Sequence, residues 1–227
     1  MGRPIFPPAK ISLADIGFAL QSDSMNPNWA EENLQTIRTL MERSALYRRA
    51  LAPIMLLAGA LGITAAAIGM LLHLTTIFAF DALWLGTAVI VVFGAFLIAR
   101  KQAFKEKEPF WSPPTRRVTQ AIVPPLLVGL FLELSWVGSG NASSDSVTFW
   151  MLFYGCALHC AGFFTTRSVK YFGWIFLFGA CAMVYSNTSG RLDDAVSPNL
   201  LMGLFFGLLH LAYGVYLYVT EKGKHAA

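Results

Sequence analysis

Six long apolar segments, separated by short polar stretches, constrain this sequence more than any other feature. A helix needs about 20 mostly apolar residues to cross the hydrocarbon core of a bilayer. The six segments are 51–73, 82–99, 119–137, 148–164, 171–187 and 199–219. Inside hydrocarbon every backbone N–H and C=O must be paired within its own segment, so we expect each segment to be helical. The sequence therefore predicts an all-α, polytopic integral membrane protein with six transmembrane helices.

The lysine and arginine residues fall on one side of this six-span arrangement. Positively charged residues concentrate on the cytoplasmic side of membrane proteins. All 17 lysine and arginine residues except Arg191 lie in residues 1–50, 100–118, 165–170 or 220–227. These four segments share one side of the membrane if the chain crosses it six times. We therefore expect both termini, including the short tail 220–227, to be cytoplasmic, in a plasma (inner) membrane protein with a six-helix domain at 51–219.

Composition and motif content exclude several classes of protein. Only 13% of the residues are charged and 56% are hydrophobic, whereas a soluble domain has about 25% charged residues. The segments between the spans are too short for a separate catalytic domain, and no nucleotide-binding, zinc-protease or hydrolase motif is found. No block of basic residues interleaved with aromatics suggests nucleic acid as a partner.

The residues before the first span divide into two parts. Residues 1–27 are rich in proline, serine and asparagine, so we expect weak order there, with Met25 as an alternative start. From residue 28 to residue 50, apolar residues recur at helical spacing, which predicts a cytoplasmic amphipathic helix lying on the bilayer or docking a protein partner.

Four arginines flank the predicted spans on the cytoplasmic side. Arg48 and Arg49 end the amphipathic helix, and Arg116 and Arg117 precede the third span. Basic residues at this position are attracted to anionic lipid headgroups. We therefore expect all four to anchor the chain at the membrane interface.

Ionisable residues inside a span are costly and are candidates for function. The predicted spans contain three, Glu133, His159 and His210. Glu133 lies about four residues from the outer end of its helix, roughly 6 Å deep. We expect its carboxyl group to reach water there, and we expect Asp81, at the outer edge, to be wetted as well.

The two intramembrane histidines lie at the same predicted depth. His159 and His210 each fall eleven residues after the start of their spans, roughly 16 Å from the outer boundary. If the fourth and sixth spans touch, the two imidazoles could share a hydrogen bond, a metal or a haem iron, since histidine is the commonest metal ligand.

Two cysteines flank His159 in the stretch FYGCALHCAGFF. Cys156 and Cys160 are four residues apart, so all three side chains can share one face of a helix. A structural zinc site needs four thiolate or imidazole ligands, which one helix does not supply. Free cysteine commonly packs as a small apolar residue, and Gly155 and Gly162 lie nearby. We therefore interpret this stretch mainly as a close helix contact and expect no cofactor, with a metal or haem site as the alternative.

A second glycine pattern lies in the last span. Gly203, Gly207 and Gly214 recur at helical spacing, and small residues allow helix backbones to approach closely. This face is a candidate for helix contact or for self-association of two copies.

Three functional hypotheses follow. The first is a non-enzymatic membrane protein that regulates, anchors or assembles partners through its cytoplasmic helix 28–50. The second is a small-solute transporter or channel, and the third is a haem or redox membrane protein that uses His159 and His210. Because no cofactor motif stands out from the packing pattern, we take the first as the main prediction from the sequence.

Overall fold

The computed structural model describes residues 27–105, 107, 110–136, 144–189 and 196–225. Within these ranges, the side chains of residues 27–30, 32, 33, 35–49, 114, 136 and 221–225 are outside the description. The chain divides into two compact units, residues 1–43 and 44–227. The predicted weak order before residue 27 and the alternative start at Met25 fall outside the described residues.

The described part of the chain is built from α-helices and the turns between them. The long helices are α2 (Pro27–Leu71), α3 (Ile77–Lys105), α4 (Pro113–Trp136), α5 (Ser144–Ala161) and α6 (Arg167–Thr188). The last helix is continuous and has three parts, α7 (Pro198–Met202), the π-helical η1 (Gly203–Leu208) and α8 (Leu209–His225). The predicted all-α class is confirmed.

Five helices in the described ranges are long and apolar enough to cross a membrane. They contain the segments Ala50–Leu71, Ile77–Lys105, Thr115–Ser135, Arg167–Thr188 and Pro198–Thr220. The chain is therefore a multi-pass membrane protein, with the lipid bilayer as its partner. The remaining predicted span, 148–164, overlaps α5 only at residues 148–161, and its last three residues lie in the turn that follows. α5 has 18 residues but begins with the polar sequence Ser144–Asp145–Ser146 and is not among the five.

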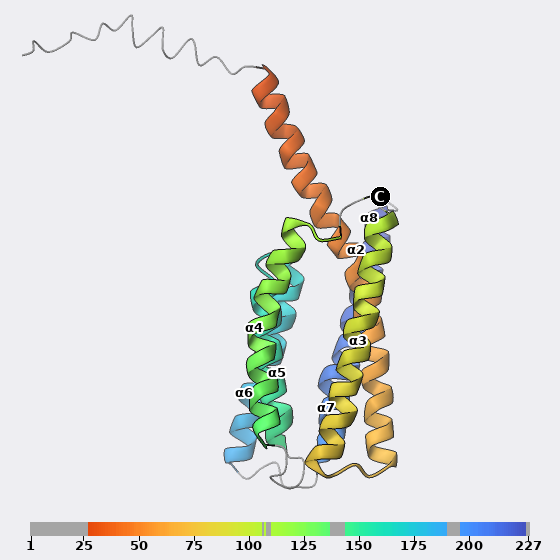
Figure 1. Ribbon diagram of the computed structural model, residues 1–227, viewed down its shortest axis with the longest axis vertical. Helices are drawn as coiled ribbons and strands as arrows, with labels where there is room; N and C mark the ends of the chain where they lie inside the picture. Colours follow the sequence, from red (N-terminus) through yellow and green to blue (C-terminus); the bar gives the residue numbers. More distant parts are fainter. Residues whose placement is uncertain (1–26, 106, 108–109, 137–143, 190–195, 226–227) are drawn as a thin grey trace, which may run out of the picture. The chain divides into compact units, whose positions relative to one another are not determined.

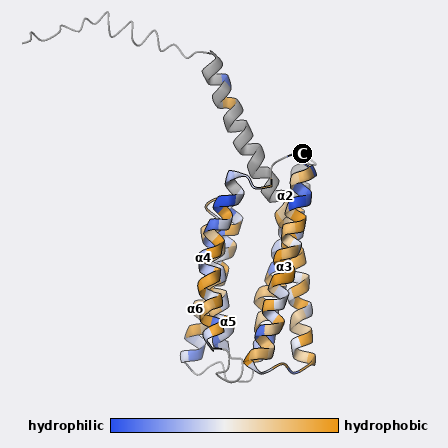
Figure 2. Ribbon diagram, viewed as in Figure 1, coloured by the Kyte–Doolittle hydropathy of each residue, from blue (hydrophilic) through white to orange (hydrophobic). Residues whose placement is uncertain are grey.

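Within residues 44–227 the helices run alternately in opposite directions (Figure 1). One end of this unit carries the end of α2 and the start of α3, and the other carries the end of α3 and the start of α4. α5 packs against both α4 and α6. Large apolar side chains such as Val89, Phe93, Phe131 and Phe178 are exposed on the outer helix faces, as expected for surfaces that contact lipid tails. Hydrophobic residues accordingly occur along the whole length of the helices in this unit (Figure 2).

Glycines bring the first and last spans together. A Cβ atom on Gly62 would lie 2.7 Å from the Phe206 carbonyl oxygen and 2.8 Å from Gly207 Cα. A Cβ atom on Gly214 would lie 2.8 Å from the backbone nitrogen of Leu56. Only glycine permits such close approach of two helix backbones.

The face of Gly203, Gly207 and Gly214 is therefore occupied within the chain. A Cβ atom on Gly203 would meet Ala66 of α2 at 2.5 Å, and one on Gly207 would meet Ile63 at 2.9 Å. The predicted close helix contact is confirmed, but self-association through this face is wrong, because α2 already covers it.

The FYGCALHCAGFF stretch also packs closely. A Cβ atom on Gly155 of α5 would lie 3.1 Å from the Gly173 carbonyl oxygen of α6, and one on Gly162 would lie 2.7 Å from the backbone of Lys170. The interpretation of this stretch as a close helix contact is thus confirmed, and α6 is the neighbouring helix.

Candidate functional site

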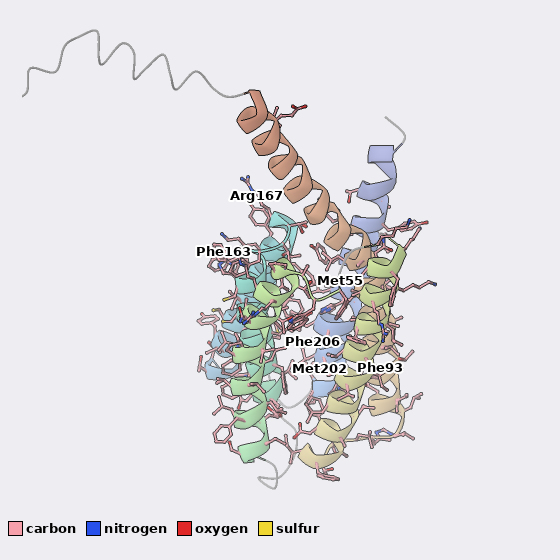
Figure 3. All side chains as sticks on the ribbon, turned by 45° about the horizontal axis from the view of Figure 1, so that its top comes forward. Met55, Phe93, Phe163, Arg167, Met202 and Phe206 are labelled. Carbon is pink, nitrogen blue, oxygen red and sulfur yellow. The ribbon has the colours of Figure 1, made fainter. Side chains whose placement is uncertain are left out.

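A cavity of about 360 Å³ lies within the unit formed by residues 44–227. Its walls come from α2, α3, α4, α5 and the last helix. Figure 3 shows Met202 and Phe206, which line the cavity, between α3 on one side and α4 on the other. A volume of this size falls within the range of small-molecule binding sites, about 300 to 1,000 Å³.

The walls of the cavity are mostly apolar. α3 contributes residues from Asp81 to Val92, and α4 contributes residues from Val123 to Leu130. Two indole rings, from Trp84 and Trp150, also face the space. On the α2 side the lining residues are Ala58 and Gly62, whose small size leaves room for the cavity.

A hydrogen-bonded tyrosine and histidine form one polar group of the site. The Tyr154 hydroxyl oxygen on α5 lies 2.6 Å from Nε2 of His210 on α8, and both residues line the cavity. His210 is only 2% exposed, and its ring contacts Phe172, Phe176 and Phe206. This aromatic surround fixes the orientation of the imidazole.

The second imidazole nitrogen of His210 has no hydrogen bond of ordinary geometry in the described part of the chain. The His210 side chain also interacts with the backbone of Phe205 and Phe206, which belong to the π-helical turn η1. Buried polar atoms without a partner are uncommon in proteins. The backbone of η1 therefore supplies polar contacts for the buried imidazole ring.

The π-helical turn η1 aligns three lining residues. Met202, Phe206 and His210 are spaced by four residues, and an ideal α-helix turns about 40° beyond a full turn in four residues. The wider π-helical turn reduces this divergence, so all three side chains reach the same cavity. Single π-helical turns inside α-helices occur frequently at functional sites.

Two carboxyl groups form the second polar group. Asp81 of α3 and Glu133 of α4 lie close enough for their carboxyl groups to interact, and Ser146 of α5 lies beside Glu133. Asp81 is 5% exposed and Glu133 is 2% exposed. The prediction that both carboxyl groups reach water is therefore wrong, because α5 covers Glu133 and the two groups face each other between helices.

The chemistry of this carboxyl pair requires a shared proton. Two ionised carboxylates offer only acceptors, so a hydrogen bond between Asp81 and Glu133 needs a proton on one of them. Asp81 Oδ2 and Glu133 Oε1 are buried and receive no hydrogen bond from any further residue in the described ranges. The pair thus forms a buried acidic group at one end of the cavity, with Asp81 in its lining.

His159 and His210 have different surroundings. The His159 ring contacts Phe163, in the turn after α5, and Trp174 of α6, and both side chains are exposed. Tyr154, which bonds His210, precedes His159 by five residues on α5, so the two side chains point about 140° apart around the helix. The structure brings Tyr154, not His159, to His210.

The remaining predicted site residues lie away from the cavity. Cys156 is partly buried, while Cys160 and Cys181 are exposed, and all three are free thiols. Among the described residues, no group of three or more His, Cys, Asp or Glu side chains could hold a metal ion. Arg116 and Arg117 are exposed near the start of α4, and the side chains of Arg48 and Arg49 lie outside the described residues.

Four residues line the cavity that the sequence did not predict as site residues: Asp81, Trp84, Trp150 and Tyr154. The signal for Asp81 was present, since it is an acidic residue within an apolar helix that begins at Ile77 rather than at residue 82. Comparisons with known proteins offer no further guide, because no family model, no curated protein and no solved structure matches this chain.

Proposed function

We propose that this chain is a six-span membrane transporter for small, largely apolar solutes. The cavity between the helices is the observation that carries this proposal. Its walls are apolar, and its polar groups are few and grouped in two places, Tyr154 with His210 and Asp81 with Glu133. Few, well-placed polar groups in an apolar pocket are typical of sites that bind and orient a small molecule.

The packing of α5 supports six spans rather than five. Its 18 residues correspond to about 27 Å of helix, close to the thickness of the hydrocarbon core. α5 packs between α4 and α6, and its polar residues Ser146 and Thr148 are buried against neighbouring helices. A helix whose polar side chains face other helices can cross the bilayer with a lower mean hydropathy than a helix that is surrounded by lipid.

The distribution of basic residues supports cytoplasmic termini. Arg100, Lys101, Lys105 and Lys107 lie at or just beyond the end of α3, and Arg116 and Arg117 lie near the start of α4. Arg167 and Lys170 lie at the start of α6, which is at the same end of the unit when helices alternate. By the positive-inside rule this end faces the cytoplasm, and the C-terminal end of α8 lies on the same side.

The other two functions have less support. An anchoring or assembly role for residues 28–50 depends on side chains that are mostly outside the described residues, so it stays a prediction. A haem or redox role for His159 and His210 loses its geometric basis, because the two rings have different neighbours. The cavity is the feature that favours the transporter.

Binding can be tested with 4-bromobiphenyl, whose bromine quenches nearby indole fluorescence. In purified protein in lipid nanodiscs, we expect saturable quenching because Trp84 and Trp150 line the cavity. Ala88→Phe, which fills the cavity from α3, should abolish the saturable component. Ala82→Phe is the matched control, since Ala82 is exposed on the same helix and is not in the lining. Quenching that never saturates, or that Ala88→Phe leaves unchanged, would contradict the proposal.

Transport is tested in proteoliposomes with radiolabelled aromatic acids, alcohols and amines. We expect uptake of at least one class above the level of protein-free liposomes, and loss of that uptake in Ala88→Phe but not in Ala82→Phe. If the wild-type protein and Ala88→Phe take up every class equally, the proposed transport function is wrong.

A further inference from the structure

We propose that the solute of this cavity is an apolar organic cation, and that it competes with a proton for the carboxyl pair of Asp81 and Glu133. This inference rests on the proposed function, because it names the class of solute that the cavity takes. Its basis is the position of the pair, which lies at one end of an otherwise apolar space with Asp81 in the lining.

When it holds a single proton, the carboxyl pair carries a negative charge that no described residue balances. The groups that act on the two carboxyls are Ser146 and the carboxyls themselves, and no lysine, arginine or histidine in the described ranges contributes. Asp81 and Glu133 are more than nine-tenths buried, and one oxygen of each receives no hydrogen bond from a further described residue. A buried negative charge is unfavourable unless it is paired, so this site favours an incoming cation.

Groups on the neighbouring helices do not supply that cation. Asn199 of α7 is neutral, and its side chain bonds Trp84 and the Leu74 carbonyl. Asp145 of α5 is acidic and exposed, and it accepts a hydrogen bond from Asn187. His73, just after the end of α2, is exposed. The described surroundings of the pair are therefore neutral or acidic.

The rest of the cavity fits an apolar body attached to the cation. The lining residues of α3 run from Asp81 to Val92, eleven positions apart, which corresponds to about 16 Å along the helix. Trp84 is one turn from Asp81 on the same helix, and Trp150 faces the space from α5. Indole faces attract cations, most strongly where water is excluded. A neutral solute would leave the acid pair unbalanced, and an acidic solute would be repelled.

Charge balance sets the role of the proton. When Asp81 and Glu133 share one proton, the pair has a net charge of minus one, and a monovalent cation neutralises it without proton release. When acid adds a second proton, the pair is neutral, and binding of one cation must release one proton to water. Affinity for the cation is therefore expected to fall as the pH is lowered, by up to tenfold per pH unit in the range where the second proton binds.

The test compares two probes of the same shape, N-methyl-4-phenylpyridinium, which is permanently charged, and 4-methylbiphenyl, which is neutral. Calorimetric titration of the protein in nanodiscs between pH 5 and pH 8 should show tighter binding of the cation and weaker binding at the acid end. Asp81→Asn should weaken cation binding at least tenfold and flatten its pH dependence, with little effect on the neutral probe. Asp145→Asn, which removes an exposed carboxylate from the same end of the unit, should leave the binding of both probes unchanged.

The outcomes separate this inference from the proposed function. If both probes bind equally and pH has no effect on binding, the inference about the cation is wrong, while the proposal that the cavity binds solutes is supported. If neither probe binds to protein that retains its native helical content, the proposed function is wrong as well. The wild-type pH series needs no variant, so it decides the question even if Asp81→Asn does not fold.

Discussion

The indole N–H of Trp84 donates a hydrogen bond to Asn199 Oδ1 at 2.9 Å, across 115 positions of sequence. Asn199 Nδ2 donates in turn to the Leu74 carbonyl at 3.0 Å. One buried amide side chain at the start of α7 thus joins α3 and the turn between α2 and α3. Because Trp84 also lines the cavity, this contact fixes the position of an indole ring that a solute would meet.

The Trp84–Asn199 hydrogen bond should be measurable by a double-mutant cycle. We expect Trp84→Phe and Asn199→Ala to destabilise the protein non-additively, with a coupling energy of about 0.6 kcal/mol and at most about 1.7 kcal/mol, the average and the maximum for side-chain hydrogen bonds between membrane helices. Unfolding in mixed micelles with increasing SDS gives the required free energies. Additive effects would show that the two side chains do not interact in the membrane.

Loss of the Tyr154 hydroxyl should destabilise the helix bundle. Tyr154→Phe leaves Nε2 of the buried His210 without its partner, so we expect a loss of about 0.6 to 2 kcal/mol. Tyr171→Phe is the control, because Tyr171 is exposed on α6 and should change stability by less than about 0.5 kcal/mol. The same SDS titration measures both, and equal effects of the two substitutions would refute the role given to the Tyr154–His210 pair.

The close approach of α2 to the last helix makes Gly62 sensitive to the smallest substitution. In Gly62→Ala the added Cβ would lie 2.7 Å from the Phe206 carbonyl oxygen, so the backbones must separate. We expect a cost of about 1 to 3 kcal/mol, as for other overpacked sites. Gly86→Ala offers the control, since a Cβ there meets nothing within 4 Å and alanine favours helix by about 1 kcal/mol. A Gly62→Ala protein as stable as Gly86→Ala would contradict this packing.

Membrane orientation is tested by cysteine labelling in a variant without the three native cysteines. Thr75, Lys107 and Thr165 lie between helices and are suitable positions for single cysteines. In intact cells, Thr75→Cys should react with an impermeant maleimide, while Lys107→Cys and Thr165→Cys should react only after permeabilisation. Reaction of Thr165→Cys in intact cells would mean that α5 does not cross the membrane, and reversal of all three would place the termini outside.

Five of the six predicted spans could be identified from the sequence, because hydropathy is a local property of each segment. The start of the second span could not be identified in this way: the sequence predicts Asp81 at its outer edge, whereas the helix begins at Ile77. That misplacement hid an acidic residue inside a helix. The contact between Asp81 and Glu133 could not be predicted from the sequence either. It depends on how α3 and α4 face each other and not on either segment alone.

The sequence predicts the depth of a residue in the membrane better than it predicts which neighbouring helix its side chain faces. Counting from the span starts placed His159 and His210 at the same depth, but the rotation of α5 decides which side chain meets His210, and Tyr154 does so. The glycine pattern similarly predicted a close contact for Gly207 without identifying α2 as the helix that it meets. In both cases the sequence does not show which neighbouring helix each residue faces, because that depends on the tertiary structure.

The most direct test of the solute-binding cavity is a structure of the protein in lipid nanodiscs with an iodinated N-methyl-4-phenylpyridinium. The proposal predicts iodine density between Trp84, Trp150 and Tyr154, with the pyridinium nitrogen directed toward Asp81. Iodine density only at the lipid-facing surface, with side chains closing the space between α3 and α4, would contradict it.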